Sequence, residues 1–253
     1  MSLAVKLVLA PVLVAQALRT RATLPRLPEA AGEREGVAGA AHSARVEGQS
    51  RALHLLVAGD SSAAGVGVDD QQHALAAPLA AELARLAATP VRWRLVAASG
   101  LGTADTLELL RREHAVRPLP RQDVAVVVSG VNDVVDQVRP RRALAARAAM
   151  VDWLRATLGV RHAVFAALPP LHAFPGLPQP LRWVAGGDAR RHDQALERWT
   201  RARRDVSRVA LALPLDARMM AVDGFHPGAA AYRRMAEAIA RHIVQRVLPS
   251  MPP

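Results

Sequence analysis

The stretch LHLLVAGDSS, residues 53–62, joins a short apolar run to a turn of small and polar residues. An apolar run of this length that ends at a glycine is typical of a strand buried on both faces of a sheet. Ser61 stands just beyond the carboxyl end of that strand. Ligand sites of parallel sheets lie beyond the carboxyl ends of the strands, so we look for chemistry at this and the equivalent positions.

Strand and helix patterns alternate from residue 53 to the C-terminus. Apolar runs predict strands over residues 53–58, 91–98, 123–129, 160–168 and 207–214. Helical periodicity predicts helices over residues 74–88, 103–113, 141–158, 188–205 and 228–247. Strands that alternate with helices form parallel βαβ units, which place helices on both faces of the sheet. The sequence therefore predicts an α/β fold with a five-stranded parallel sheet.

Composition excludes several classes of protein. With 253 residues, of which 51% are hydrophobic, the chain can bury a sizeable core. It has no cysteine, so disulfides, thiolate nucleophiles and cysteine zinc sites are excluded. No run of eighteen uncharged apolar residues occurs, which excludes a polytopic membrane protein.

The net charge of +11 resembles that of a nucleic-acid-binding protein. All basic residues except Lys6 are arginines, however, and they are spread along the chain rather than clustered. Aromatic residues make up only 3% of the chain, which leaves few platforms for base stacking. We therefore expect solvated arginine faces and no nucleic-acid partner, with a weak attraction to anionic surfaces left open.

The turn after the first strand lacks the features of a nucleotide site. Val66 stands where a phosphate-binding P-loop needs lysine, and Asp70 stands where a dinucleotide fingerprint needs its third glycine. No cofactor is expected. What remains is Ser61, which is either a nucleophile whose N–H lies at a helix terminus or a helix-capping serine.

Two further strand ends carry hydrogen-bond donors. After the second strand, Gly100 or Gly102 can offer a bare backbone N–H to a ligand. After the third strand, Asn132 carries a side-chain amide. Each of these residues is also common in an ordinary tight turn.

The segment Asp223-Gly-Phe-His-Pro227 follows the last strand. An aspartate three residues before a histidine can accept a hydrogen bond from Nδ1–H across one turn, which leaves Nε2 as a base. Taken together, the four strand ends supply a nucleophile, two oxyanion donors and an oriented base, which are the parts of an acyl-transfer site.

The chain resembles the SGNH hydrolases, also called GDSL-type esterases or lipases, in four blocks: GDS at residues 59–61, a glycine near residue 100, GxND at residues 130–133 and DxxHP at residues 223–227. The resemblance covers about residues 53–247. It implies a flavodoxin-like three-layer α/β/α sandwich and no metal.

By position, the resemblance makes Ser61 the nucleophile, His226 the base and Asp223 the residue that orients the base. It makes the Ser61 N–H, the Gly100 N–H and the Asn132 amide the oxyanion hole. The first block reads GDSS instead of GDSL, and Ala98-Ser99 precede Gly100 where the family often has asparagine. Gly102 therefore remains an alternative to Gly100. Asp60 and Asp133 are expected to brace their loops by hydrogen bonds.

The predicted activity is the hydrolysis of a small-molecule or lipid-like carboxylic ester through an acyl-serine intermediate. Two alternatives on the same site are a carbohydrate O-deacetylase and a thioesterase. The non-enzymatic alternative is a flavodoxin-like module that binds phosphate or another anion, which leaves the Asp223–His226 pair without a role.

The connection over residues 169–187 contains five prolines, which argue against a regular helix or central strand. Its apolar residues, Phe174 and Leu177 among them, form either a wall of a substrate pocket or a loop packed on the core.

Residues 1–23 form an apolar N-terminal segment, residues 24–49 a Pro/Gly-rich linker, and residues 50–253 the catalytic domain. The N-terminal segment has three interpretations: a cleaved export signal, an interfacial or membrane anchor, and a helix packed on a cytoplasmic domain. The arginines that follow the apolar run favour the anchor, tethered by the linker.

Overall fold

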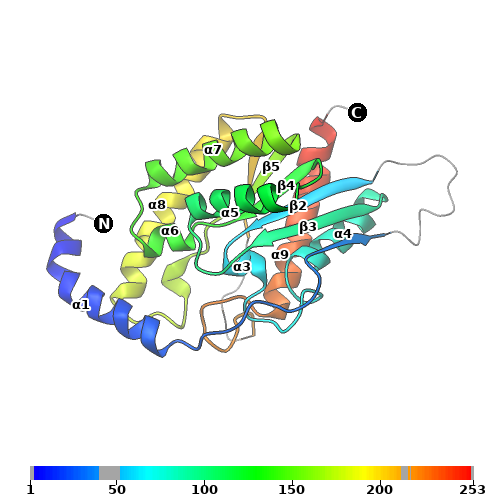
Figure 1. The fold of residues 1–253 in the computed structure, drawn as a ribbon. Coiled ribbons are helices and arrows are strands. Elements are labelled where there is room, and N and C mark those ends of the chain that lie inside the picture. The colour runs from blue at the N-terminus through cyan, green and yellow to red at the C-terminus, as the bar shows by residue number, and fades with distance from the viewer. Residues whose placement is uncertain (1–2, 40–51, 212–215, 217, 252–253) are drawn as a thin grey trace, which may run out of the picture.

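The structure, a computed structural model, describes residues 3–39, 52–211, 216 and 218–251, and it places one sheet between two layers of helices (Figure 1). The strands are β1 (Glu35–Ala38), β2 (Leu53–Gly59), β3 (Val91–Ala97), β4 (Val124–Val128), β5 (His162–Ala166) and β6 (Val206–Val209). The α-helices are α1 (Leu3–Thr23), α3 (Ser61–Ala64), α4 (Ala76–Ala87), α5 (Thr103–Val116), α6 (Val131–Val135), α7 (Pro140–Leu158), α8 (Leu181–Arg201) and α9 (Ala229–His242). Short single turns are η1 (Leu171–Ala173), η2 (Ile243–Val247) and η3 (Leu248–Ser250).

The strand order in the sheet is β1-β3-β2-β4-β5-β6. The five strands from β2 to β6 are parallel to one another, which confirms the predicted parallel sheet. The sheet has one strand more than predicted, because β1 pairs antiparallel with β3 at one edge. The fifth predicted strand is shorter than expected, and residues 212–214 of that prediction lie outside the described residues.

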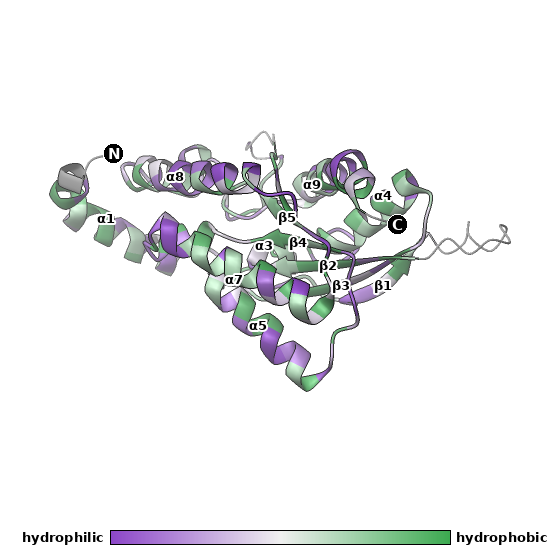
Figure 2. Ribbon diagram, turned by 90° about the horizontal axis from the view of Figure 1, so that it is seen from above, coloured by the Kyte–Doolittle hydropathy of each residue, from purple (hydrophilic) through white to green (hydrophobic). Residues whose placement is uncertain are grey.

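Helices cover both faces of the sheet, as the three-layer prediction requires. Figure 2 shows α4 and α9 on one side of the sheet and α5 and α7 on the other. Alternate residues of β2 explain this arrangement. Leu55 and Val57 pack with α4 and α9, whereas Leu56 and Ala58 pack with α5, α7 and α8. Both faces of the parallel strands are therefore buried.

The prediction of a linker over residues 24–49 was wrong for its described part, residues 24–39. Ala30 is buried, and its N–H donates to the carbonyl of Ala64. Farther along, β1 adds to the sheet edge, and Gly36 lies so close to the Trp93 ring that an added Cβ would meet it at 3.0 Å. The domain therefore begins before residue 50. Residues 40–49 lie outside the described residues.

The prediction that residues 169–187 contain no regular helix was wrong for their last part. Here α8 begins at Leu181, directly after the last of the five prolines. Proline is compatible with the start of a helix, because the first N–H groups of a helix have no partner within it. The proline-rich connection is therefore limited to residues 169–180.

Helix α1 lies alongside α8 at one end of the molecule (Figure 1). The Lys6 ammonium contacts the carboxylate of Asp188 at 2.5 Å, and the Gln16 side chain bonds to the backbone of Gln179 and Leu181. No helix in the described part of the chain has the length and apolar character needed to cross a bilayer. Export and membrane attachment stay predictions.

The edge strand generates a prediction about where the domain begins. A chain that starts at Ser50 should unfold at a lower temperature than one that starts at Leu24, because it lacks β1 and exposes Trp93. Loss of this burial and pairing amounts to about 2 kcal/mol, or roughly 4–8 °C in Tm for a domain of this size. Thermal unfolding followed by circular dichroism measures the difference. Equal Tm values would mean that residues 24–49 act as a linker.

Candidate active site

The three central strands end at one level. Gly59 of β2 is the register partner of Ala97 in β3 and of Val128 in β4. Ser61, Gly100 and Asn132 follow these ends after two, three and four residues. Because β3 and β4 lie on opposite sides of β2, this is the point where the strand order reverses, and such a point opens a crevice above the sheet.

Gly59 allows the chain to turn closely against β4. Its φ is +155°, and a Cβ there would lie 1.9 Å from the carbonyl oxygen of Val128, so no other residue fits. Asp60 then caps α3 by accepting a hydrogen bond from the Ser62 N–H at 3.0 Å. The local sequence therefore places Ser61 on the first turn of a short helix, facing the crevice.

Ser61, His226 and Asp223 form a continuous hydrogen-bonded relay. The Ser61 Oγ lies 3.0 Å from His226 Nε2, and His226 Nδ1 lies 2.6 Å from Asp223 Oδ2. Asp223 is buried and His226 half-buried. The sequence separates Ser61 from His226 by 165 residues, and the sheet brings them together.

The hydrogen bonds at Asp223 keep its carboxylate ionised. Burial raises its pKa, but the His226 ring and the backbone N–H groups of His226 and Phe225 donate to it and outweigh burial, so the pKa lies below its usual range. An ionised Asp223 accepts a hydrogen bond from the Nδ1–H of His226, which leaves the lone pair of Nε2 facing Ser61.

The predicted oxyanion donors lie at the cavity that opens beside Ser61. Gly100 and Asn132 both line it. One hydrogen of the Asn132 amide is donated to the Leu101 carbonyl at 3.0 Å, which orients the amide and leaves its second hydrogen available. The N–H of the alternative donor, Gly102, is directed to Asp105 at 3.2 Å. The geometry favours Gly100 over Gly102.

A buried polar cluster supports the Asn132 loop. Asp133 accepts hydrogen bonds from the Thr103 N–H at 3.0 Å and from the Thr103 hydroxyl at 2.5 Å, as expected of a bracing residue. Arg147 of α7 is 1% exposed and approaches Asp133 at 3.6 Å. The sequence analysis missed Arg147, although a charge within the apolar stripe formed by Ala143, Met150 and Leu154 was a visible signal.

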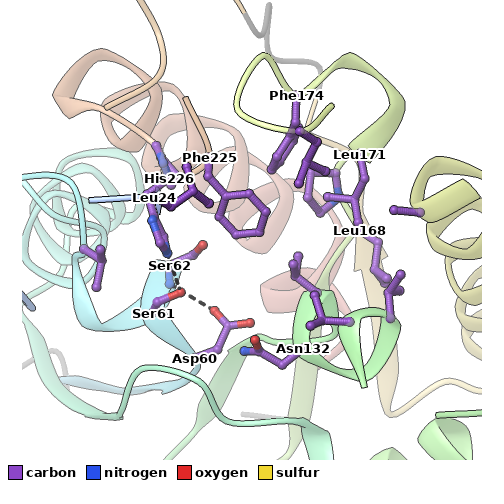
Figure 3. A pocket seen from close by; sticks show the side chains of 18 of the residues that line it. Leu24, Asp60, Ser61, Ser62, Asn132, Leu168, Leu171, Phe174, Phe225 and His226 are labelled. Atoms are coloured by element: carbon purple, nitrogen blue, oxygen red, sulfur yellow. Dashed lines mark hydrogen bonds between the residues drawn. The ribbon is translucent and has the colours of Figure 1, made fainter. Parts of the chain in front are cut away.

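The cavity beside Ser61 has a volume of about 700 Å³ and is mainly apolar. In Figure 3, Leu168, Leu171 and Phe174 lie across the cavity from Ser61. The predicted pocket residues Phe174 and Leu177 both line the cavity and are both buried, so their substrate-binding role stays a prediction.

The N-terminal segment supplies another wall of the cavity, which the sequence analysis did not foresee. Leu24 and Leu27 line the cavity, together with residues at the end of α1. The Glu29 carboxylate accepts a hydrogen bond from the Ser99 N–H at 2.6 Å, next to Gly100. Leu24 and Leu27 lie outside any helix or strand, so no periodic pattern in the sequence pointed to this wall.

In the described part of the chain, no group of three or more His, Asp or Glu side chains is placed to hold a metal ion.

Comparison with known proteins identifies the family. A family model, described as the GDSL-like lipase/acylhydrolase family, matches residues 57–234. The chain belongs to this family. It is thus an SGNH hydrolase, as the four motif blocks predicted. A search of curated protein sequences gave no match.

Several solved structures share the GDSL fold. A lipase from a goat rumen metagenome, Lip_vut3, is 16% identical with a TM-score of 0.60, covering 75% of this chain and 96% of its own. A carbohydrate esterase family 2 enzyme from Corynascus thermopiles (Myceliophthora fergusii) is 18% identical with a TM-score of 0.61, covering 79% and 68%. The esterase EstA from Pseudoalteromonas is 16% identical with a TM-score of 0.54, covering 76% and 99%. At these identities the likeness shows the fold alone.

Asp60 generates a prediction about pH. Burial raises its pKa to about 7. The folded state therefore holds a proton that the unfolded chain releases at lower pH, so stability falls as pH rises toward the folded pKa. Asp60→Asn keeps an oxygen that can cap α3 but does not titrate. The Tm of Asp60→Asn minus the Tm of the unsubstituted protein should therefore increase as the pH rises from about 5 to about 8.

Thermal unfolding across this pH range measures the difference, and Asp69→Asn on the exposed surface is the control. A constant difference between Asp60→Asn and the unsubstituted protein would contradict the raised pKa.

Proposed function

We propose that this GDSL-family chain is a serine esterase that cleaves carboxylic esters through an acyl-Ser61 intermediate. The observation that carries the proposal is the Ser61–His226–Asp223 relay, with 3.0 Å between Ser61 Oγ and His226 Nε2. A hydroxyl that bonds to an oriented imidazole is an activated nucleophile. The relay opens into an apolar cavity that can receive the acyl group.

In acylation, Ser61 Oγ attacks the ester carbonyl while His226 Nε2 takes the hydroxyl proton. The carbonyl oxygen becomes an oxyanion, to which the N–H groups of Ser61 and Gly100 and the Asn132 amide donate. As the tetrahedral intermediate collapses, the bond to the alcohol oxygen breaks. His226 then returns its proton to that oxygen, and the alcohol leaves.

In deacylation, a water molecule takes the place of the alcohol. The water oxygen attacks the acyl carbon while His226 accepts a proton from the water. The same oxyanion-hole donors stabilise the second oxyanion. Breakage of the bond to Ser61 Oγ releases the acid, and His226 returns the proton to the serine. Asp223 stays ionised throughout and stabilises the imidazolium in both steps.

The size and lining of the cavity favour a lipid-like acyl chain. An acetyl group, as in carbohydrate O-deacetylation, would leave most of the 700 Å³ unfilled. A thioester of a longer acid fits the same wall, so the thioesterase remains the second candidate. Arg21 and Arg26 also line the cavity, but a purely anion-binding module would leave the Asp223–His226 pair without a role, and the wall across from Ser61 is apolar, with Leu168, Leu171 and Phe174.

Labelling with a fluorophosphonate tests the nucleophile. We expect the probe to modify Ser61 alone, and Ser61→Ala to abolish both labelling and hydrolysis of p-nitrophenyl esters with little change in Tm. His226→Ala should cause nearly the same loss, and Asp223→Asn a smaller one. Peptide mass spectrometry locates the label, and a label on any other serine would overturn the assignment.

Asn132→Ala separates oxyanion stabilisation from the relay in the same assay. Loss of one oxyanion donor lowers kcat on the order of 100- to 1,000-fold. KM should change little, because the donor acts on the charge of the transition state. A higher KM with an unchanged kcat would make Asn132 a substrate contact instead.

Chain-length preference tests the cavity wall with p-nitrophenyl esters from acetyl to palmitoyl. Leu177→Ala and Phe174→Ala should reduce kcat/KM for long-chain esters by roughly tenfold and for the acetyl ester much less, since contacts of this kind contribute about 1–3 kcal/mol. Leu119→Ala is the matched control, because Leu119 is equally buried but does not line the cavity.

Phe174→Ala should also lower the Tm, because the Phe174 ring packs edge-on against Phe225 with centroids 5.3 Å apart. A uniform loss of activity on all esters, matching that of Leu119→Ala, would mean that the connection serves only to pack the core.

A further inference from the structure

Helix α1 leaves a set of large apolar side chains exposed, although polar side chains of the same helix face the protein. Its polar side chains Lys6 and Gln16 face the protein, where they bond to Asp188 and to the backbone of residues 179 and 181. The outer face of α1 is apolar and consists of Leu7, Val8, Val12, Val14 and Leu18, which are between 46% and 80% exposed. A surface helix normally turns its apolar side inward, so this outer face lacks a cover.

Figure 2 shows the same feature, since much of α1 is coloured as hydrophobic at the end of the molecule. The other large apolar residues that are exposed in the described part of the chain, such as Val116 and Val222, are far apart in the sequence. Single exposed apolar residues are normal, whereas a contiguous row on one helix marks an interaction site.

The charged residues of α1 itself and of the segment just after it are all basic, although Asp188 pairs with Lys6 and Asp136 lies 3.6 Å from Arg21. The first 28 residues contain no Asp or Glu, but they include Lys6, Arg19, Arg21 and Arg26. The three arginines are exposed at the C-terminal end of α1 and just beyond it. An apolar face bordered by arginines complements an anionic lipid surface, where the side chains enter the acyl boundary and the guanidinium groups meet the headgroup phosphates.

The outer face is continuous with the catalytic cavity. Leu18 belongs to the outer face and also lines the cavity. Its neighbours Ala17, Arg21 and Leu24 line the cavity too. A surface that covers the outer face therefore also meets the cavity wall.

We propose that the outer face of α1 docks on an anionic lipid bilayer, with the helix lying in the plane of the interface. The inference rests on the geometry and charge of α1 and not on the proposed esterase activity. Docking would bring the cavity to the membrane surface, where a lipid-like substrate can leave the bilayer and enter beside Leu18.

Co-sedimentation with vesicles tests the docking. Full-length protein carrying Ser61→Ala is mixed with vesicles of phosphatidylcholine alone or of phosphatidylcholine with phosphatidylglycerol, so that hydrolysis cannot alter the lipid. We expect binding to the anionic vesicles, reduced at least roughly tenfold by the triple variant Leu7→Ser, Val8→Ser and Val12→Ser. Val116→Ser is the matched control for an exposed apolar residue and should bind unchanged.

Arg19→Gln separately tests the electrostatic part and keeps the proposal falsifiable if the triple variant fails to fold. This substitution should weaken binding to anionic vesicles. Added salt should reduce the difference in binding between Arg19→Gln and the protein that keeps Arg19. Arg112→Gln on the exposed surface of α5 is its control. Assayed with the Ser61 nucleophile restored, all these variants should retain hydrolysis of a soluble short-chain ester.

Three results would overturn the proposal. The first is no binding to anionic vesicles, and the second is equal binding by the triple variant and its control. The third is a dimer, measured by sedimentation equilibrium without lipid, that the triple variant dissociates. In that case a second copy of the chain covers the outer face.

Discussion

The close approach of β2 to β4 at Gly59 is the constraint on which the site depends. The Val128 carbonyl occupies the space that a Cβ at residue 59 would need, and it also accepts a hydrogen bond from the Asp60 N–H at 3.0 Å. The chain therefore leaves β2 in a fixed direction, and Ser61 enters the crevice at a fixed height above the sheet. Parallel register then sets the heights of Gly100 and Asn132 by the same hydrogen-bonding pattern.

Buried titratable side chains maintain this arrangement at a cost in stability. Asp60 is buried beside Ser61, where burial raises its pKa to about 7, and Asp133 and Arg147 are buried beneath the Asn132 loop. Taking carboxylates and a guanidinium out of water is unfavourable unless hydrogen bonds and opposite charges compensate. Asp60 accepts a hydrogen bond from the Ser62 N–H, and Asp133 accepts one from the Thr103 N–H. The hydrogen bonds that offset the cost of burial therefore also position these two turns. Loop geometry and charge burial are thus linked at this edge of the sheet.

Much of the fold and site could be predicted because the signals are local. Each parallel strand is a continuous apolar run, and Asp223 and His226 are three residues apart on one turn. The strand β1 escaped notice because its four residues alternate between exposed and half-buried, and its partner β3 lies more than fifty residues away. The start of α8 was missed because prolines were counted over the whole connection, although the last of them, Pro180, precedes the helix.

The wall formed by residues 24–27 explains why family membership leaves the substrate open. The family match begins at residue 57, whereas Leu24, Leu27 and the end of α1 line the cavity, and Glu29 holds the loop before Gly100. In the proposed reaction, the residues that break the ester bond come from the family's motifs, whereas part of the cavity wall comes from a segment outside the match. Because contacts with nonreacting parts of a substrate decide which substrate is preferred, we expect the chain-length preference of the proposed esterase to depend on this N-terminal segment as well as on the matched domain.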